Sequence, residues 1–155
     1  MSKAVLISIR PEWVKKILAG EKTLEVRKTR PKMETPFKCH IYCTNSGVAM
    51  GMWGKHGKVV GEFVCDKIDC VDIPYPAFMG KLDKHWTEDS CCTYYQLHRY
   101  FYHDRAYFWH ISNLKIYDDP KQLNEFMGLR KTKFGYAPVE IKRPPQSWCY
   151  VEELK

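Results

Sequence analysis

The chain of 155 residues is long enough to bury one hydrophobic core, and we expect one domain over residues 1–155. Its hydrophobic content of 45% and charged content of 28% exclude a disordered chain. No apolar run reaches the ~20 residues of a membrane-spanning helix. The N-terminus also lacks a small-residue cleavage site, so we expect a cytoplasmic protein.

The formal charge of +7 is spread unevenly along the chain. Residues 15–32 carry seven Lys and Arg against two Glu, and residues 129–145 carry five against one. Residues 62–89 instead carry seven Asp and Glu against three Lys. If the two basic segments fold onto one face, they form a footprint for phosphates. The alternative is a basic domain that binds no anion, and charge alone leaves both readings open.

The cysteines argue against a disulfide framework. There are seven of them, an odd number, in a chain without an export signal. Their spacings do not form the paired CxxC pattern of a zinc site, and no HxxxH pattern occurs. We therefore expect reduced, mostly buried thiols, no metal site and no cofactor.

The first third of the chain predicts a strand, a helix and a second strand. Residues 4–9 are a continuous apolar run typical of a buried strand. Pro11 suits the first turn of a helix, and Gly20 suits the cap at its end. Residues 22–28 then predict a strand in which one side is polar and the other apolar. The polar side is made by Thr23, Glu25 and Arg27, and the apolar side by Leu24 and Val26.

The rest of the chain reads as strands interrupted by short helices. Strands are predicted over 37–43, 59–73 (bent at Gly61) and 147–154, and residues 105–119 predict either a strand pair or one long strand. Residues 29–36 and the glycine-rich 45–58 predict loops, and PYPAF (74–78) breaks the chain. Ser90 can cap a helix that runs to about His103, and Pro120 opens a short helix. The basic segment 128–146 contains glycine and proline and carries no predicted element.

A set of residues at fixed spacing resembles the signature of the ASCH-domain family, a branch of the PUA-like superfamily. The resemblance extends to the stretches YFWHISNLKIYDDPKQLNEF and RPPQSWCYVEEL, which look like a phage- and bacterial-type subgroup. It implies an α+β fold, a small PUA-like β-barrel (the ASCH fold) with a few flanking helices and a cleft beside the first helix. The signature residues are Pro11, Ile17, Leu18, Gly20, Lys22, Thr23, Glu25 and Arg27.

The resemblance also implies a ligand class. ASCH proteins have been proposed to bind RNA or nucleotide-like ligands, and some small members are amidohydrolases that deacylate acetylcytidine with a lysine, a threonine and a glutamate. The lysine matches Lys22, but the threonine position holds Glu25. The glutamate falls near Glu88 or Asp89.

Lys22 and Glu25 are the candidate catalytic residues. Glu25 in place of a threonine can activate water, or it can accept hydrogen bonds from the edge of a base. Lys22 can hold a phosphate or act as a base. Thr23, Arg27 and Lys28 join them as candidate ligand-binding residues. The alternative is a solvated strand face with a weak ion pair.

Four residues elsewhere complete the predicted ligand site. Trp53 in the glycine-rich loop and Trp148 near the C-terminus are candidates to stack on a base, and Ser147 can donate a hydrogen bond beside Trp148. Glu62 is a carboxylate that shares a strand side with two valines. Trp109 alternates inside a strong strand and is expected in the core instead.

Three functions remain open from the sequence. The first is a module that binds RNA or a nucleotide-like small molecule. The second is an amidohydrolase acting on a modified nucleoside such as acetylcytidine, and the third is a protein-interaction factor. The sequence does not decide whether a reaction is catalysed.

Overall fold

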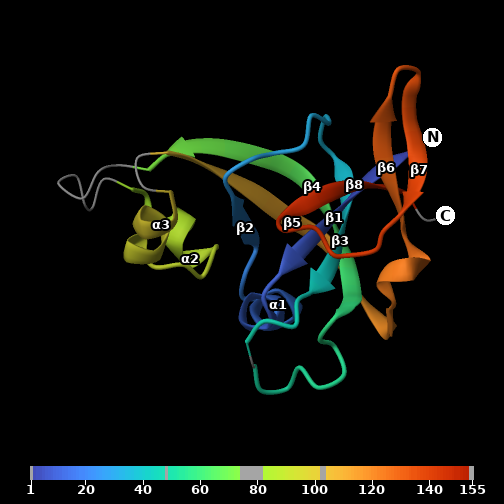
Figure 1. The fold of residues 1–155 in the computed structure, drawn as a ribbon. Helices are drawn as coiled ribbons and strands as arrows, with labels where there is room; N and C mark the ends of the chain where they lie inside the picture. Colours follow the sequence, from blue (N-terminus) through green and yellow to red (C-terminus); the bar gives the residue numbers. More distant parts are fainter. Residues whose placement is uncertain (1, 48, 74–81, 102–103, 154–155) are drawn as a thin grey trace.

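The computed structural model describes residues 2–47, 49–73, 82–101 and 104–153. Within them it forms eight strands, three α-helices and one 3₁₀ helix (Figure 1). The strands are β1 (Lys3–Ile9), β2 (Leu24–Arg27), β3 (Phe37–Cys43), β4 (Lys58–Asp72), β5 (Arg105–Lys121), β6 (Met127–Thr132), β7 (Gly135–Glu140) and β8 (Trp148–Glu152). The helices are α1 (Pro11–Leu18), α2 (Lys84–Glu88), α3 (Tyr94–Phe101) and the 3₁₀ helix η2 (Leu123–Glu125). None of the described helices is both long and apolar enough to cross a lipid bilayer.

All eight strands form one sheet in the order β2-β5-β4-β3-β1-β8-β6-β7. The β1–β3 pair is parallel, and the other paired strands are antiparallel. Because β2 and β7 stand at opposite edges and do not pair, the sheet is not closed. The expectation of a β-rich fold with a few helices is confirmed, whereas the closed barrel is not. In Figure 1, α2 and α3 lie on the side of β2, and the β6–β7 hairpin projects at the other side.

Helix α1 begins and ends where the local sequence predicts. Pro11 occupies its first turn, and Val14 and Ile17 are buried against β1 and β3 residues of the core. The chain reverses at Gly20, whose φ of +78° is a left-handed conformation that glycine adopts at low cost. This tight turn delivers Lys22 to the interior directly after the helix.

The long strands β4 and β5 form the main antiparallel ribbon of the sheet. The register shifts between Val59 and Gly61, so β4 is irregular at the predicted glycine. The bulge moves Val60 into the cluster that contains Phe63, while Glu62 faces Tyr117 on the other side of the sheet. The prediction that Glu62 shares a side with Val60 is therefore wrong, because an extra residue in a strand inverts the alternation that follows it.

The segments after β4 differ from the predicted ones in several places, and helix α2 was not predicted. Helix α3 is capped by Thr93, whose hydroxyl accepts from the Gln96 backbone N–H at 3.1 Å, and not by Ser90. Strand β5 continues to Lys121, so Pro120 lies in a strand and the short helix starts at Leu123. Residues 128–146 contain the β6–β7 hairpin, which was not predicted. The break at 74–78 lies outside the described residues.

The aromatic residues are divided between core and surface. Trp109 is fully buried, as predicted, and packs edge-to-face on Phe37 with ring centroids 5.9 Å apart. The loop between β3 and β4 is anchored by buried Met52 and leaves Trp53 96% exposed. All seven cysteines are free thiols, as predicted, although Cys70 is exposed and only three are fully buried.

Candidate ligand-binding cleft

A cleft of about 930 Å³ lies where α1, β2, α3 and the segment before β8 meet. Its size is in the range of pockets that bury a small molecule, roughly 300–1,000 Å³. Its polar and charged lining residues are Ser8, Arg10, Glu12, Lys22, Glu25, Arg27, Lys28, Thr44, Ser46, Cys92, Gln96, Arg99 and Gln146. Lys and Arg outnumber Glu five to two, so the cleft is basic.

Lys22 is buried at the floor of the cleft with 2% of its surface exposed. The chain turns after α1 because the Lys22 backbone N–H donates to the Lys16 carbonyl at 3.1 Å. The side-chain Nζ then donates to the Ser90 carbonyl at 2.5 Å and lies 3.8 Å from the Glu25 Oε1. It also lies 5.2 Å from the centre of the Trp13 ring. A buried ammonium held in this way is positioned for an anion or a carbonyl oxygen.

Glu25 is a buried carboxylate between two cations. It is 5% exposed, and its two oxygens lie 3.8 Å from Lys22 Nζ and 3.5 Å from Arg27 Nη2. The Val26 backbone N–H donates to Oε1 at 2.9 Å. Leu24 and Val26 point away into a separate apolar cluster, so the alternation of β2 separates polar from apolar side chains as predicted. Burial of the Glu25 and Arg27 side chains excludes a solvated face at these two residues, whereas Thr23 is exposed.

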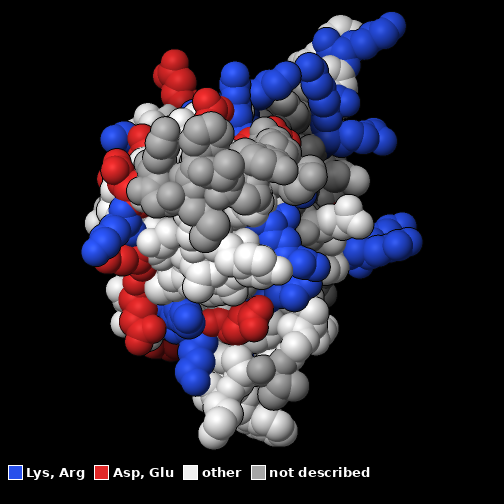
Figure 2. All heavy atoms as spheres, turned by 90° about the vertical axis from the view of Figure 1, so that its left-hand side faces the viewer, with Lys and Arg blue, Asp and Glu red and all other residues white. Residues whose placement is uncertain are grey.

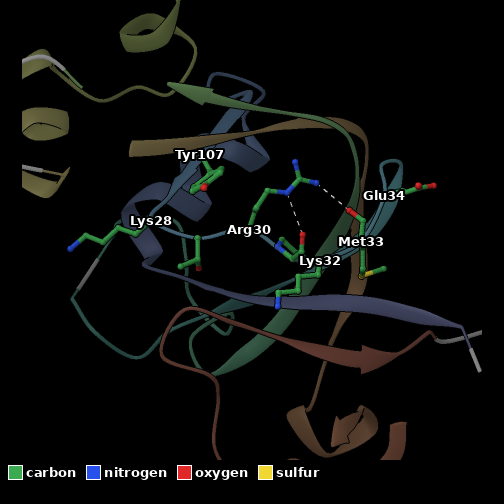
Figure 3. A pocket seen from close by; sticks show the side chains of 8 residues that line it. Lys28, Arg30, Lys32, Met33, Glu34 and Tyr107 are labelled. Carbon is green, nitrogen blue, oxygen red and sulfur yellow. Dashed lines mark hydrogen bonds between the residues drawn. The ribbon is translucent and has the colours of Figure 1, made fainter. Parts of the chain in front are cut away.

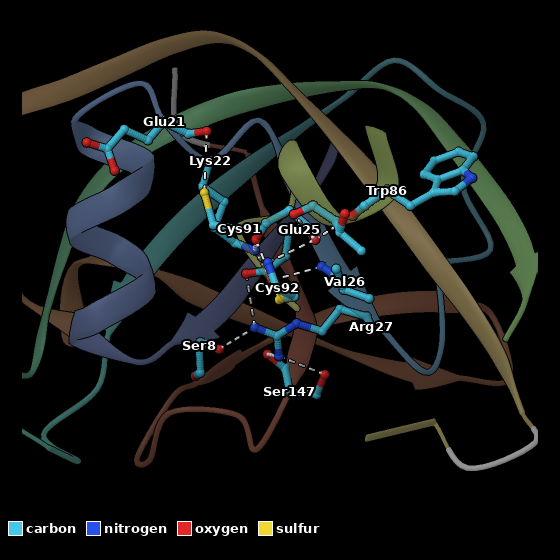
Figure 4. A network of polar contacts seen from close by, with 12 residues as sticks. Ser8, Glu21, Lys22, Glu25, Val26, Arg27, Trp86, Cys91, Cys92 and Ser147 are labelled. Carbon is cyan, nitrogen blue, oxygen red and sulfur yellow. Dashed lines mark hydrogen bonds and ion pairs between the residues drawn. The ribbon is translucent and has the colours of Figure 1, made fainter. Parts of the chain in front are cut away.

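Arg27 connects β2 to β1, which is not its neighbour in the sheet, and to the segment just before β8. Its Nη2 donates to the Ser8 carbonyl of β1 at 2.7 Å, and its Nη1 donates to the Ser147 hydroxyl at 3.1 Å (Figure 4). The planar guanidinium can make these bonds together because its donors diverge in a fixed fork. Lys22, Glu25 and Arg27 thus form a buried cluster with one excess positive charge.

The rim of the cleft carries a second set of cations. Arg10, Lys28 and Arg99 are exposed, line the cleft, and form no ion pair with any described residue. Lys28 Nζ lies 4.7 Å from the centre of the Tyr100 ring, a cation–π distance. Figure 2, which views the molecule from the left-hand side of Figure 1, shows one group of Lys and Arg side chains just right of the centre, with Asp and Glu side chains below it. The charge of Arg10, Lys28 and Arg99 is available to a ligand.

Cys92 lines the same cleft and was not identified from the sequence. Its Sγ donates to the Ser90 carbonyl at 3.5 Å. Burial raises the pKa of the thiol above its usual value, and the opposing effect of Lys22 does not cancel the rise. The thiol is therefore protonated at neutral pH. No local motif points to Cys92, because only the packing of the segment before α3 against β2 brings it here.

Four predicted ligand-binding residues lie outside the cleft. Thr23 precedes β2 and is exposed, since its backbone N–H donates to the Asp89 carbonyl at 2.8 Å and holds it away from the floor. Trp53 projects from its loop, and Trp148 is half-buried with Nε1 donating to Thr29 Oγ1 at 3.0 Å. Glu62 lies in another cluster on the far side of the bulge. The structure therefore does not bring these four residues together with Lys22 and Glu25 in the cleft.

The remaining predicted residues differ in whether they line the cleft. Lys22, Glu25, Arg27 and Lys28 line the cleft, and Ser147 reaches it through its hydrogen bond to Arg27. Glu88 and Asp89 are exposed and do not line it. Arg10 and Arg99 were missed, although Arg10 directly precedes the proline of the signature.

Glu62 belongs to a polar cluster of its own. Tyr117 donates to its Oε1 at 2.8 Å, and Lys38 Nζ lies 3.2 Å from its Oε2. Burial acts to raise the Glu62 pKa, but these two hydrogen bonds lower it below its usual value. His40 Nδ1 lies 3.0 Å from the Tyr117 hydroxyl, and burial lowers the pKa of this imidazole to about 4. Among the described residues no group of three or more His, Cys, Asp and Glu is arranged to hold a metal ion.

No protein-family model matches the sequence, and no curated protein shows significant sequence similarity to it. Its fold, however, is similar to solved structures. A crystal structure of ASCH from Zymomonas mobilis has a TM-score of 0.60 and 20% identity, covering 97% of this chain and 88% of the other. A mutant of the same ZmASCH has a TM-score of 0.62 and 19% identity, covering 98% and 92%. The structural likeness extends over nearly the whole chain, which therefore has an ASCH-domain fold.

Proposed function

We propose that the cleft binds a nucleotide-like ligand, either free or as part of an RNA chain. The observation that carries this proposal is the buried Lys22–Glu25–Arg27 cluster at the floor of a basic cleft. A cluster with one excess positive charge favours an anionic or electron-rich partner. The Glu25 carboxylate accepts hydrogen bonds, whereas Lys22 and Arg27 donate them. This combination suits the edge of a base, which carries both donors and acceptors.

The rim supports the binding of phosphate. Arg10, Lys28 and Arg99 line the cleft and form no ion pair with a described residue, and Glu12 is the only carboxylate besides Glu25 among the described lining residues. When Lys and Arg bind phosphates, counterions are released into solution. The affinity therefore falls as the salt concentration rises. A ligand with its phosphate at the rim leaves its base directed toward the floor.

The floor supports recognition of a base. Glu25 can accept a hydrogen bond from an exocyclic amino group, as carboxylates do from cytosine. Tyr100 is 49% exposed at the lip of the cleft and can contribute an aromatic face. The ASCH-domain fold is consistent with a ligand of this class.

A second candidate function is hydrolysis of an acylated nucleoside. It is favoured by Lys22, which is buried within 3.8 Å of a carboxylate at the position that matches the signature. Glu25 would take a proton from water while the hydroxide oxygen bonds to the acyl carbon, and Lys22 would stabilise the negative charge on the acyl oxygen. The C–N bond would then break as the amine takes the proton from Glu25, leaving a carboxylic acid. Cys92 is a poor alternative nucleophile because burial raises its pKa.

Calorimetric titration with cytidine and uridine monophosphates, at low and moderate salt, tests the binding proposal. We expect saturable binding that weakens with salt and falls about tenfold in the double variant Arg10→Gln/Arg99→Gln. The control is Lys115→Gln, which removes an exposed lysine of β5 outside the cleft. Equal affinity in the double variant and the control would exclude this cleft as the phosphate site.

Incubation with acetylcytidine, followed by chromatography for cytidine, tests the hydrolase. Lys22→Met keeps the apolar stem of the side chain and removes the amine, so it should abolish turnover while the circular dichroism spectrum stays unchanged. No release of cytidine by the wild-type protein would exclude this substrate.

A further inference from the structure

A groove of about 520 Å³ lies beside the cleft and shares Lys28 with it. It is formed by the loop of residues 28–34 and by Tyr107 (Figure 3). Lys28, Arg30 and Lys32 are exposed along this loop, and Glu34 is the one carboxylate among the described lining residues. In Figure 3 the Glu34 and Lys28 side chains point to opposite sides of the loop. The groove therefore continues the positive charge of the cleft.

The loop is attached to β8 by two hydrogen bonds. The Lys32 backbone N–H donates to the Tyr150 hydroxyl at 2.8 Å, and Trp148 Nε1 donates to Thr29 Oγ1 at 3.0 Å. Trp148 and Tyr150 are in edge-to-face contact, with ring centroids 5.4 Å apart. These contacts bring Lys32 next to an aromatic row on β8.

The aromatic row leads on to the β6–β7 hairpin. Tyr150 packs on Tyr136 of β7 with centroids 5.9 Å apart, and Lys3 Nζ lies 4.3 Å from the centre of the Tyr136 ring. Lys131 of β6 pairs directly with Tyr136, so both side chains lie on the same side of the hairpin. Phe134, in the turn of the hairpin, is 99% exposed.

These contacts define a basic strip of five cations interleaved with tyrosines and a tryptophan. None of the five forms an ion pair with a described residue. In Figure 1 the loop after β2 lies between the helices and the β6–β7 hairpin, so the strip runs across the molecule from the cleft to the hairpin. In order from the cleft, its cations are Lys28, Arg30, Lys32, Lys3 and Lys131.

We propose that a single-stranded nucleic acid seated in the cleft continues along the basic strip to the hairpin. This inference rests on the proposed function of the cleft and names the substrate class as a polynucleotide. The strip is longer than a mononucleotide: residues 28–32 reach up to about 13 Å at ~3.3 Å per residue, and the strip then crosses β8, β6 and β7, which lie ~4.8 Å apart from strand to strand. A ligand that uses the whole strip must carry repeated negative charges.

The alternation of cations and aromatic rings matches a single strand better than a duplex. Proteins that bind single strands combine a basic groove along the backbone with rings that contact unpaired bases. The exposed Phe134 and the half-buried tyrosines offer such rings, whereas a duplex keeps its bases stacked inside. RNA and DNA share this chemistry, and the experiment separates them.

Fluorescence anisotropy with labelled oligonucleotides tests the proposal. The probes are single strands of about 12 and about 3 nucleotides, each as RNA and as DNA, and a duplex of about 12 base pairs. We expect the long single strand to bind at least about tenfold more tightly than the short one. The double variant Lys32→Gln/Lys131→Gln should weaken only the long strand, about tenfold, and reduce its log–log salt slope by about 1.4.

The hairpin supplies a matched control. Arg130 is adjacent to Lys131 and is also exposed, but it pairs with Ala137 and so lies on the opposite side of the ribbon. Arg130→Gln should therefore weaken the long strand by less than about threefold. RNA and DNA of equal affinity, or a preference for RNA, both support a polynucleotide strip. Duplex binding as tight as single-strand binding would overturn it.

The cleft variant Arg10→Gln/Arg99→Gln separates this inference from the proposed function. If that variant loses both strands while Lys32→Gln/Lys131→Gln matches Arg130→Gln, the cleft binds nucleotides and the strip is wrong. If the cleft variant binds both strands normally, the proposed function fails and the continuous path fails with it. Absence of binding to every oligonucleotide overturns the strip.

Discussion

Arg27 and Ser8 join the two ends of a five-strand arc that backbone pairing leaves open. Arg27 is on β2 and Ser8 on β1, with β5, β4 and β3 between them in the sheet, yet the Arg27 Nη2 donates to the Ser8 carbonyl at 2.7 Å. The contact shows that the sheet curls until its edge strand returns to β1. The Arg27 side chain thus joins β2 to β1 at the floor of the cleft, where a closed barrel would have backbone pairing between these strands.

Removing the Arg27 side chain should destabilise the protein strongly. Arg27→Ala leaves the Ser8 carbonyl without this donor and removes a cation from buried Glu25, so we expect the free energy of unfolding to fall by about 3 kcal/mol. Urea denaturation followed by circular dichroism measures this. Arg99→Ala, which removes an exposed arginine, should cost at most about 0.5 kcal/mol. Equal losses in both variants would contradict the closing role of Arg27.

His40 should make the protein less stable as the pH falls. Burial lowers its pKa to about 4 from 6.5, so between these values the unfolded chain binds a proton that the folded protein does not. Stability is therefore present above pH ~6.5 and is lost progressively toward pH ~4, by up to about 3 kcal/mol. The measurement is urea denaturation across this range for the wild type and for His40→Asn, which does not titrate. Parallel pH profiles for the two proteins would refute the prediction.

A side chain at Gly61 should disrupt the pairing of β4 with β5. A Cβ at this position would lie 2.6 Å from the backbone oxygen of Lys115, which cannot move without breaking the ribbon. We expect Gly61→Ala to lower the free energy of unfolding by about 2–3 kcal/mol. At Gly128 the nearest atom is a side-chain carbon of Ile141 at 3.2 Å, so Gly128→Ala should cost about 1 kcal/mol or less. Thermal unfolding compares the stabilities of the two variants. A larger loss in Gly128→Ala than in Gly61→Ala would contradict the close approach of the Lys115 backbone to Gly61.

The thiols should react in an order set by burial. Cys70 is exposed, whereas burial raises the pKa of Cys92 and raises that of Cys39 well above its usual value. We expect iodoacetamide at pH 7.5 to label Cys70 first, Cys92 much more slowly, and Cys39 only after unfolding. Peptide mass mapping over time gives the order. A nucleotide bound in the cleft should slow the labelling of Cys92 further and leave that of Cys70 unchanged.

The local elements of this protein were predictable because each depends on residues close together in the chain. The strand at 3–9, helix α1 with its glycine cap, and strand β3 follow from apolar runs and from Pro11 and Gly20. The alternation in β2 predicted that Glu25 and Arg27 share a side, and the structure buries both beside Lys22. The core position of Trp109 also followed from its strand pattern.

The tertiary structure decided what the cleft contains, since those contacts join residues far apart in sequence. Sequence spacing could not reveal that Cys92 and Arg99 meet β2, nor that Ser8 and Ser147 converge on Arg27. A one-residue bulge at Val60, seen against β3, placed Glu62 in a different cluster, because strand alternation predicts a face only while the register is unbroken. The β6–β7 hairpin was missed because its glycine and exposed cations are typical of a loop. The two strands form only because their backbone N–H and C=O groups pair with each other across the turn.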